Sequence, residues 1–132
     1  MPIHGIGSDL IRVARFEALL ARHGDRFAKR ILDDGELADY AAVKDRASFL
    51  AKRFAAKEAA AKALGTGIRD GLRLADFGVA HDPRGKPGLR LHGRAAELAA
   101  AREIVASHLS ISDEGGMALA FVVFERGGPR HA

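Results

Sequence analysis

The pattern of apolar and polar positions predicts one long helix near the middle of the chain, which opens at Asp45 or Ser48 and runs to Leu64. Alanine recurs throughout this stretch and gives it a high intrinsic helix propensity. Gly65 follows Leu64 and is suited to the left-handed backbone conformation in which many helices end. A helix this rich in alanine is thin, so other elements or a ligand can pack closely against it. We therefore expect the rest of the fold to be organised around this helix.

Shorter patterns divide the chain before the central helix into one strand and three helices. The predicted elements are a strand at residues 3–11 and helices at residues 12–23, 26–32 and 36–43. The first helix carries apolar side chains at helical spacing and should end at Gly24. Asp25 is a suitable N-cap for the second helix, because Asp side chains accept hydrogen bonds from the free N–H groups of a first turn.

Beyond the central helix, the sequence alternates between strands, turns and one further helix. The predicted elements are strands at residues 74–81, 89–91, 108–112 and 117–124, and a second alanine-rich helix at residues 94–105. From that helix, Leu98 and Val105 are expected to face the core. Residues 113–116 should form a hairpin connection. Residues 117–124 are apolar on both faces, which predicts a central strand or a strand covered by a partner subunit.

These elements predict an α+β fold: one small domain over residues 1–132, with an antiparallel sheet packed against the long alanine-rich helix. The composition, 48% hydrophobic and 29% charged, is typical of a soluble globular protein. No apolar run reaches the roughly 18 residues that a membrane-spanning helix needs, and the first residues lack the pattern of a secretion signal. Cys is absent, which excludes disulfides and thiol chemistry. We expect a cytoplasmic protein with no membrane partner.

The net charge of +4 favours an acidic partner, such as nucleic acid, an anionic small molecule, an acidic protein or a membrane surface. The chain has no Trp and a single Tyr, so a base-stacking surface is poorly supplied even with seven Phe. Nucleic acid is therefore not the favoured partner. Four arginines project from the polar side of the region before the central helix: Arg12, Arg15, Arg22 and Arg26. This stripe is either a solvated face or a docking surface for an acidic protein.

Asp9 is the first candidate for chemistry. If the predicted first strand is regular, Asp9 shares one of its faces with Gly5 and Gly7. Two missing side chains beside a carboxylate indicate that something approaches that face closely. Asp9 could instead cap the helix that follows, although capping would not explain the two glycines.

Glu58 on the central helix is the second candidate. At 3.6 residues per turn its face is shared by Phe54, Lys62 and Gly65. A ligand lying along this face would meet an aromatic ring, a carboxylate, an ammonium group and bare backbone. A simpler interpretation is also open, because Glu58 and Lys62 form an i,i+4 pair that stabilises any exposed helix by about 0.2–0.5 kcal/mol.

Several familiar catalytic motifs are absent: the sequence has no GxxxxGK[ST], no GxGxxG, no HExxH and no GxSxG. The six histidines, His131 near the C-terminus included, are scattered without the spacing of metal ligands. What remains is the pair Asp9 and Glu58, with Lys57 and Lys62 beside the second carboxylate. Such a set fits Mg²⁺, which is commonly held by one or two carboxylates and completed by substrate phosphates. The spacing alone does not establish that Asp9 and Glu58 meet.

Two stretches carry a resemblance to a known family. Ile6-Gly7-Ser8-Asp9 matches its first motif, and the run from Arg53 to Lys62, RFAAKEAAAK, matches its second. Further similar segments lie at residues 24–32, 63–68, 85–87 and 108–111. The chain resembles the holo-[acyl-carrier-protein] synthases, the small subfamily of phosphopantetheinyl transferases, over nearly its whole length.

The resemblance implies an Mg²⁺-dependent enzyme that transfers the 4′-phosphopantetheine arm of coenzyme A to a serine of apo-acyl carrier protein and releases adenosine 3′,5′-bisphosphate. By motif position, Asp9 and Glu58 would be the Mg²⁺ ligands, and Lys62 would be the catalytic phosphate partner beside them. The residues implied in coenzyme A binding are Arg53, Phe54, Lys57, Lys62, Gly65, Lys86 and Ser112. Lys57 lies about 100° round the helix from Glu58, so its side chain could face elsewhere.

The same resemblance implies a homotrimer with active sites between subunits. Acyl carrier proteins are acidic, so the implied docking residues are Arg15, Arg22 and Arg26. One position departs from the family: many members carry His after the segment matching Ser110-Ile111-Ser112, where this chain has Asp113. Asp would repel a nucleotide phosphate, and Arg53 or Arg46 is expected to compensate.

Two other interpretations stay open on the sequence alone. A non-enzymatic basic module could bind nucleic acid through its arginines, with no need for either carboxylate. A catalytically idle subunit could bind the carrier protein without transferring anything. In the enzyme itself, the proton of the acceptor serine has two candidate acceptors, a metal-bound water and a carboxylate.

Overall fold

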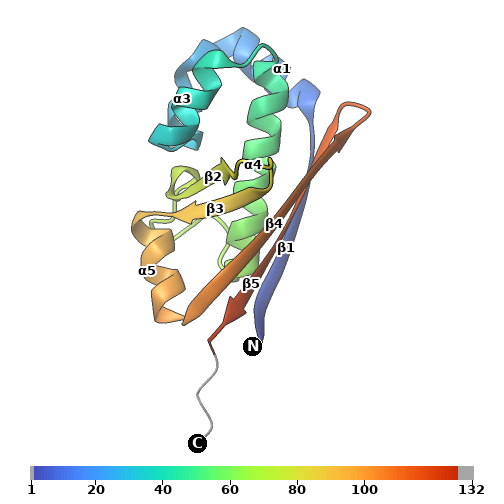
Figure 1. The fold of residues 1–132 in the computed structure, drawn as a ribbon. Coiled ribbons are helices and arrows are strands. Elements are labelled where there is room, and N and C mark those ends of the chain that lie inside the picture. The colour runs from blue at the N-terminus through green and yellow to red at the C-terminus, as the bar shows by residue number, and fades with distance from the viewer. Residues whose placement is uncertain (1, 128–132) are drawn as a thin grey trace, which may run out of the picture.

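The computed structural model describes residues 2–127 and shows a long central helix with two antiparallel sheets and shorter helices around it (Figure 1). The strands are β1 (Ile3–Arg12), β2 (Phe77–His81), β3 (Pro87–Leu91), β4 (Ile104–Glu114) and β5 (Met117–Arg126). The helices are α1 (Val13–His23), α2 (Ala28–Ile31), α3 (Asp34–Ala42), α4 (Arg46–Leu64) and α5 (Gly93–Ala101), with short 3₁₀ helices η1 (Gly24–Arg26) and η2 (Leu74–Asp76). None of the helices in the described residues has the length and apolar character needed to cross a membrane. The predicted α+β fold with an alanine-rich central helix is confirmed.

The three-stranded sheet has the order β1-β5-β4, with both pairs antiparallel. β5 lies in the middle of this sheet, which is one of the two alternatives predicted for it. One face, which includes Val122 and Phe124, is buried, while Leu119 and Phe121 lie exposed on the other. β4 and β5 are joined by a turn at Gly115 and Gly116, whose φ angles of 58° and 76° suit a two-residue hairpin.

The glycines of β1 allow the backbone of α4 to lie directly against the strand. A Cβ atom added to Gly7 would sit 2.0 Å from the Ala59 carbonyl oxygen, and one added to Gly5 would sit 2.2 Å from the Ala63 carbonyl oxygen. No side chain fits in that space. The close approach predicted for this face of the strand is therefore confirmed, and the approaching element is the central helix.

α4 begins and ends as its sequence indicates. The Asp45 side chain accepts a hydrogen bond from the Ser48 backbone N–H at 3.0 Å, so Asp45 and not Ser48 caps the first turn. At the other end, Gly65 adopts the left-handed conformation with φ of 94°. Both ends are therefore set by local residues, independently of the packing.

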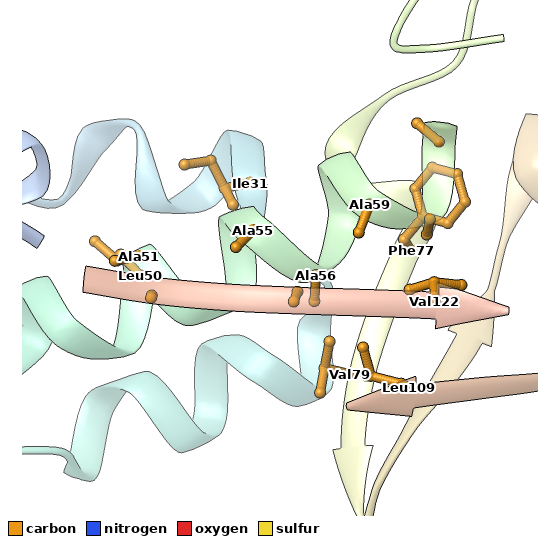
Figure 2. Packing of buried hydrophobic residues seen from close by; sticks show 14 of the residues in the cluster. Ile31, Leu50, Ala51, Ala55, Ala56, Ala59, Phe77, Val79, Leu109 and Val122 are labelled. Atoms are coloured by element: carbon orange, nitrogen blue, oxygen red, sulfur yellow. The ribbon is translucent and has the colours of Figure 1, made fainter. Parts of the chain in front are cut away.

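The apolar core forms where α4 meets the three-stranded sheet and β2 (Figure 2). α4 contributes mostly alanines, so its own side chains fill little volume. Larger side chains from the surrounding strands fill the space around it: Phe77, Val79, Leu109 and Val122. The helices before α4 gather around one end of it, and the β2–β3 hairpin packs nearer its middle (Figure 1).

The last helix is shorter than predicted, and the prediction that Val105 faces the core from it is wrong. α5 ends at Ala101, Glu103 adopts a positive φ of 58°, and β4 begins at Ile104. Val105 is exposed on that strand. No glycine or proline marks the end of the alanine-rich run, whereas the β-branched pair Ile104-Val105 favours the strand.

The predicted capping role of Asp25 is also wrong. Its carboxylate accepts a hydrogen bond from the Tyr40 hydroxyl at 2.6 Å and pairs with Arg46 at 2.9 Å. α2 begins only at Ala28 and has no side-chain cap. Asp25 therefore ties η1 to α3 and α4, a long-range role that its position before a helical pattern does not reveal.

Replacing Gly7 with Ala should lower the free energy of unfolding by about 2–3 kcal/mol, because the added methyl group would overlap the Ala59 carbonyl and push β1 away from α4. Gly88→Ala is the control, since Gly88 also lies in a strand but a Cβ there meets no atom within 4 Å. Urea denaturation measures both variants. Equal losses of stability would contradict the close contact between β1 and α4.

Candidate active site

Asp9 and Glu58 reach one site from two elements, β1 and α4. Lys62, one turn beyond Glu58, donates from Nζ to Asp9 Oδ1 at 3.2 Å and to the Ser8 carbonyl at 2.9 Å. The Asp9 charge also acts on Glu58. Asp9 does not cap α1, whose N-cap is Arg12 without a side-chain hydrogen bond. The structure therefore brings together the three side chains for which a catalytic role was expected.

The electrostatics of the site favour a cation between the two carboxylates. Burial raises the pKa of Glu58, and the nearby Asp9 carboxylate raises it further, against the opposing charges of Lys62 and Arg15. Because the folded-state pKa lies above the ordinary value, ionised Glu58 lowers folding stability at neutral pH, and this penalty disappears as the pH falls below the ordinary pKa of glutamate. A bound cation would remove the same repulsion without protonation.

The oxygen donors of the site are incomplete as a coordination sphere. Within residues 2–127, no group of three or more His, Cys, Asp or Glu side chains is placed to hold a metal ion. Asp9 and Glu58 could supply two carboxylates to a hard cation such as Mg²⁺, which often keeps its other positions for water and substrate phosphates. The residues present therefore fit such an ion when a ligand completes the set.

α1 borders the site through Arg15. Its guanidinium lies 5.1 Å from the centroid of the Phe54 ring, and Phe54 packs on Phe16 with ring centroids 5.3 Å apart. The Arg15 charge opposes the rise in the pKa of Glu58, so Arg15 lies close enough to act on that carboxylate. The Phe54 ring therefore packs against Arg15 and does not offer a free aromatic surface to a ligand.

Lys57 points away from the carboxylates into a buried cluster with Glu36 of α3. Its Nζ lies 2.6 Å from Glu36 Oε1 and also donates to the Phe77 carbonyl, and the side chain has no exposed surface. Burial lowers the pKa of Lys57, and the Glu36 carboxylate opposes this effect. The ligand contact expected for Lys57 is inconsistent with this position. The offset of about 100° from Glu58 turns it into the protein interior.

Arg53 shares this cluster but also lines a pocket of about 210 Å³ between α4, the β2–β3 turn and β4. The pocket includes Lys52, His81 and Asp113, and neither Asp9 nor Glu58 borders it. Burial lowers the pKa of His81, and the Arg53 charge lowers it further. Two permanent cations against one carboxylate make this pocket suited to an anionic ligand.

Lys52 is the cation that faces Asp113. Its Nζ lies 4.0 Å from Asp113 Oδ1, and both side chains are partly exposed at the pocket. Arg46, expected from the sequence to compensate for Asp113, is instead paired with Asp25 and lies 4.9 Å from the centroid of the Tyr40 ring. Arg53 does line the pocket. Of the two alternatives expected from the sequence, the structure therefore favours Arg53 over Arg46, and it adds Lys52.

The remaining residues implied in ligand binding surround these two sites. Gly65 follows the last turn of α4, three positions beyond Lys62. Lys86 is exposed in the β2–β3 turn, and its backbone N–H donates to Asp82 at 2.9 Å. Ser112 is exposed on β4, in a shallow hollow that includes Leu10.

A larger cavity of about 530 Å³ lies elsewhere, beside the start of α3, and contains none of the predicted site residues. Its central carboxylate, Asp33, is already paired with Arg90 at 3.0 Å and His92 at 2.9 Å. Burial opposes ionisation of Asp33, but the hydrogen bonds from Arg90, Glu36 and His92 prevail and hold its pKa well below the usual range. The central carboxylate of this cavity is therefore already satisfied by neighbouring side chains of the same chain.

Comparison with known proteins decides the family of the chain. A family model described as the 4′-phosphopantetheinyl transferase superfamily matches residues 5–122. The chain belongs to this superfamily. The resemblance carried by the two sequence motifs is therefore confirmed over most of the chain.

Relatives within the superfamily are similar over nearly their full length. A holo-[acyl-carrier-protein] synthase of Alkalilimnicola ehrlichii is 59% identical over 124 residues, which cover 93% of this chain and 97% of the relative. The crystal structure of the Neisseria meningitidis holo-[acyl-carrier-protein] synthase has a TM-score of 0.87 at 42% identity, covering 94% of this chain and 99% of that one. A Bacillus anthracis holo-(acyl-carrier-protein) synthase in complex with CoA (3′,5′-ADP) has a TM-score of 0.80 at 39% identity, covering 96% and 100%.

Sequence reasoning missed the role of Glu36, the buried partner of Lys57 and Arg53. One signal was available: Asp33 and Glu36 have the spacing of a capping box, and both of its hydrogen bonds are present. That signal would have placed the start of α3 at Asp34 instead of residue 36. It would not have revealed the ion pairs, because they join segments that lie far apart in sequence.

Proposed function

We propose that this member of the phosphopantetheinyl transferase superfamily transfers the 4′-phosphopantetheine arm of coenzyme A to a serine of an apo-acyl carrier protein in the cytoplasm. The serine oxygen forms a bond to the β-phosphorus, the bond from that phosphorus to the nucleotide breaks, and adenosine 3′,5′-bisphosphate leaves. The observation that carries the proposal is the convergence of Asp9, Glu58 and Lys62 at the contact between β1 and α4.

Each residue of the site has a physical task in this reaction. Asp9 and Glu58 would hold Mg²⁺, which when bound neutralises charge on the pyrophosphate oxygens. The Lys62 ammonium group, half exposed and anchored on the Ser8 carbonyl, would donate to a phosphate oxygen on which charge develops. Gly65 has open space where a side chain would lie, and this space would leave room for the pantetheine arm. Either a carboxylate or a water near the site would accept the serine proton.

The pocket beside Arg53 is the proposed site for the nucleotide end of coenzyme A. Arg53 and Lys52 offer positive charge to its phosphates, and Lys86 lies exposed in the neighbouring turn. Ser112 does not line this pocket; its hydroxyl would be offered to coenzyme A from the shallow hollow beside Leu10. Lys57 is left out of this set because it is fully buried.

We assign carrier docking to the arginines along α1 and η1. Arg15, Arg22 and Arg26 are all exposed, and Arg15 and Arg22 lie seven residues apart, hence on one face of α1. An acidic carrier bound there would present its serine next to the carboxylate site that Arg15 borders. The charge complementarity would steer association and fix the orientation of the carrier.

We further propose that the protein is a homotrimer whose subunits meet through the outer face of the three-stranded sheet. Four large apolar side chains are exposed there, Ile6 (59%), Leu10 (60%), Leu119 (43%) and Phe121 (43%). Exposed apolar clusters of this kind mark sites of association. Asp9 lies on the edge strand β1, whereas Asp113 and its pocket lie at the opposite edge strand, β4. A coenzyme A molecule that contacts both would therefore lie between neighbouring subunits.

The alternative of a nucleic-acid-binding module has less support. Several arginines on which it would depend are paired with carboxylates of the same chain: Arg46 with Asp25, Arg53 with Glu36, Arg73 with Asp76, Arg90 with Asp33 and Arg94 with Glu97. Phosphate binding would have to break these pairs. That alternative also assigns no task to the carboxylate pair.

Glu58→Gln should fold with equal or higher stability, by at most about 1 kcal/mol, because it removes the repulsion with Asp9. The same change should lower transfer by a factor of about 1,000, since one of the two proposed metal ligands is lost. Incubation with apo-carrier, coenzyme A and Mg²⁺, followed by intact mass measurement, gives the rate, and thermal denaturation gives the stability. Near-normal turnover by a folded Glu58→Gln protein would refute the assignment.

Arg15→Glu should raise the KM for the carrier protein by roughly tenfold, while the KM for coenzyme A changes little, because a docking charge is reversed. Arg94→Glu is the matched control: it makes the same charge change on α5, where Arg94 pairs with Glu97. Steady-state kinetics with each substrate varied in turn separate the two constants. An unchanged carrier KM for Arg15→Glu would count against the docking surface.

Subunit mixing tests the composite active site. Glu58→Gln removes the carboxylate site and Arg53→Ala weakens the pocket, so at low coenzyme A each variant alone should be nearly inactive. If each site combines the two halves from different subunits, random co-expressed trimers should recover about one quarter of wild-type activity, since half of the subunits supply each intact half. A mixture no more active than its separate components would show that both halves belong to one subunit.

A further inference from the structure

Glu36 is a carboxylate buried completely between α3 and α4. Its Oε1 atom accepts hydrogen bonds from Lys57 Nζ at 2.6 Å and from the Asp33 backbone N–H at 3.0 Å. Its Oε2 atom accepts from Arg53 Nη1 at 3.3 Å. A buried charge is tolerated only when it is paired and hydrogen-bonded, and Glu36 is the carboxylate that pairs with both of these buried cations.

Arg53 is held in one orientation by this cluster. Its Nη1 also donates to the Val79 carbonyl at 3.3 Å, and the guanidinium lies 4.2 Å from the centroid of the Phe49 ring. Within residues 2–127, Nη1 makes both of the side-chain hydrogen bonds of Arg53. The other two guanidinium nitrogens, Nε and Nη2, are not buried without a partner, so each keeps some exposed surface. Arg53 lines the pocket beside β4. Those nitrogens are therefore free to meet a ligand there.

Fixing an arginine before the ligand arrives has an energetic consequence. A free arginine side chain loses conformational entropy when it binds an anion, and this loss lowers the affinity. An arginine already clamped by a carboxylate, a carbonyl and an aromatic ring has lost that entropy during folding. The clamp also decides which edge of the guanidinium faces the pocket.

We infer that Glu36 is a positioning residue for the nucleotide part of coenzyme A. It does not touch the nucleotide and acts on it by orienting Arg53. The ligand class is an adenosine bisphosphate, and the inference rests on the proposed function. Glu36 thereby connects the start of α3, outside both sites, to the pocket that would hold the leaving nucleotide. The Lys57 ammonium group is the second cation that pairs with Glu36, and it holds α4 against β2 through the Phe77 carbonyl.

Glu36→Gln keeps the size of the side chain but removes its charge and leaves a single acceptor oxygen, which cannot serve Arg53 on one side and Lys57 on the other. It should weaken binding of adenosine 3′,5′-bisphosphate, measured by titration calorimetry, by roughly tenfold, and raise the coenzyme A KM similarly. The carrier KM should stay within about twofold, because the docking arginines are not involved. If Glu36 only stabilised the fold, Glu36→Gln would not weaken nucleotide binding while leaving the carrier KM unchanged.

Asp33→Asn is the matched control. Asp33 shares the capping box with Glu36 and pairs with Arg90 and His92, but makes no contact with Arg53. Asp33→Asn should lower the stability of the protein while its nucleotide affinity stays within about twofold of wild type. Equal nucleotide affinities for Glu36→Gln and Asp33→Asn would overturn the inference.

A double-mutant cycle tests whether Glu36 acts through Arg53. In an Arg53→Ala background, Glu36→Gln should change nucleotide affinity by less than about twofold, because the residue it orients is gone. Effects that simply add would overturn the inference. If Glu36→Gln fails to fold, the same measurement is made on Glu36→Gln/Lys57→Met, which has the same net charge in the cluster as the wild type and should also bind the nucleotide roughly tenfold more weakly.

Failure of the inference is separable from failure of the proposed function. Wild-type protein that transfers phosphopantetheine, together with a Glu36→Gln variant of normal nucleotide affinity, would overturn only the role of Glu36. Wild-type protein that binds the nucleotide but never modifies an apo-carrier would overturn the proposed function, and the cycle on nucleotide affinity would still decide the role of Glu36.

Discussion

The contact between the backbones of β1 and α4 is the constraint on which the rest of the structure depends. Gly5 and Gly7 bring the strand so close that the carbonyls of Ala63 and Ala59 occupy the space of their missing side chains. Asp9, the next residue on that face, is then held beside Glu58 and Lys62. Small residues on both partners thus produce a carboxylate pair that neither element could form alone. The packing holds the two carboxylates together despite their mutual repulsion, and a cation bound between them would relieve it.

α4 serves two sites because consecutive residues project in different directions. Glu58 points to β1, whereas Lys57 points into the interior and joins Glu36. Arg53, one turn earlier, lies in the same buried cluster and reaches the second pocket. A single rotation of the helix would disturb both sites together. The buried ion pairs with α3 and the glycine contact with β1 hold α4 from opposite sides.

The sequence predicted the elements whose signals are local, including α4 with Gly65 at its end and the close face of β1. It left Asp45 and Ser48 as alternative starts of α4, and a central or a partner-covered position for β5. It failed where long-range partners decide. Asp25 resembles a helix cap but is bound by Tyr40 and Arg46. Lys57 lies in a motif that implies ligand binding, yet Glu36 and the Phe77 carbonyl hold it in the interior. Spacing along one helix does not specify which neighbour receives each side chain. The meeting of Asp9 with Glu58 likewise required the fold.

The uncovered face of the three-stranded sheet has a consequence for the life of the newly made chain. Ile6, Leu10, Leu119 and Phe121 are presented to water by a lone protomer. Burying them against sister copies would make the melting temperature rise with protein concentration. In a dilute solution, or early in synthesis, the lone protomer would be vulnerable to chaperone capture, proteolysis and aggregation through this apolar face. Abundance and survival of this protein would then be linked, because each molecule is protected by the presence of others.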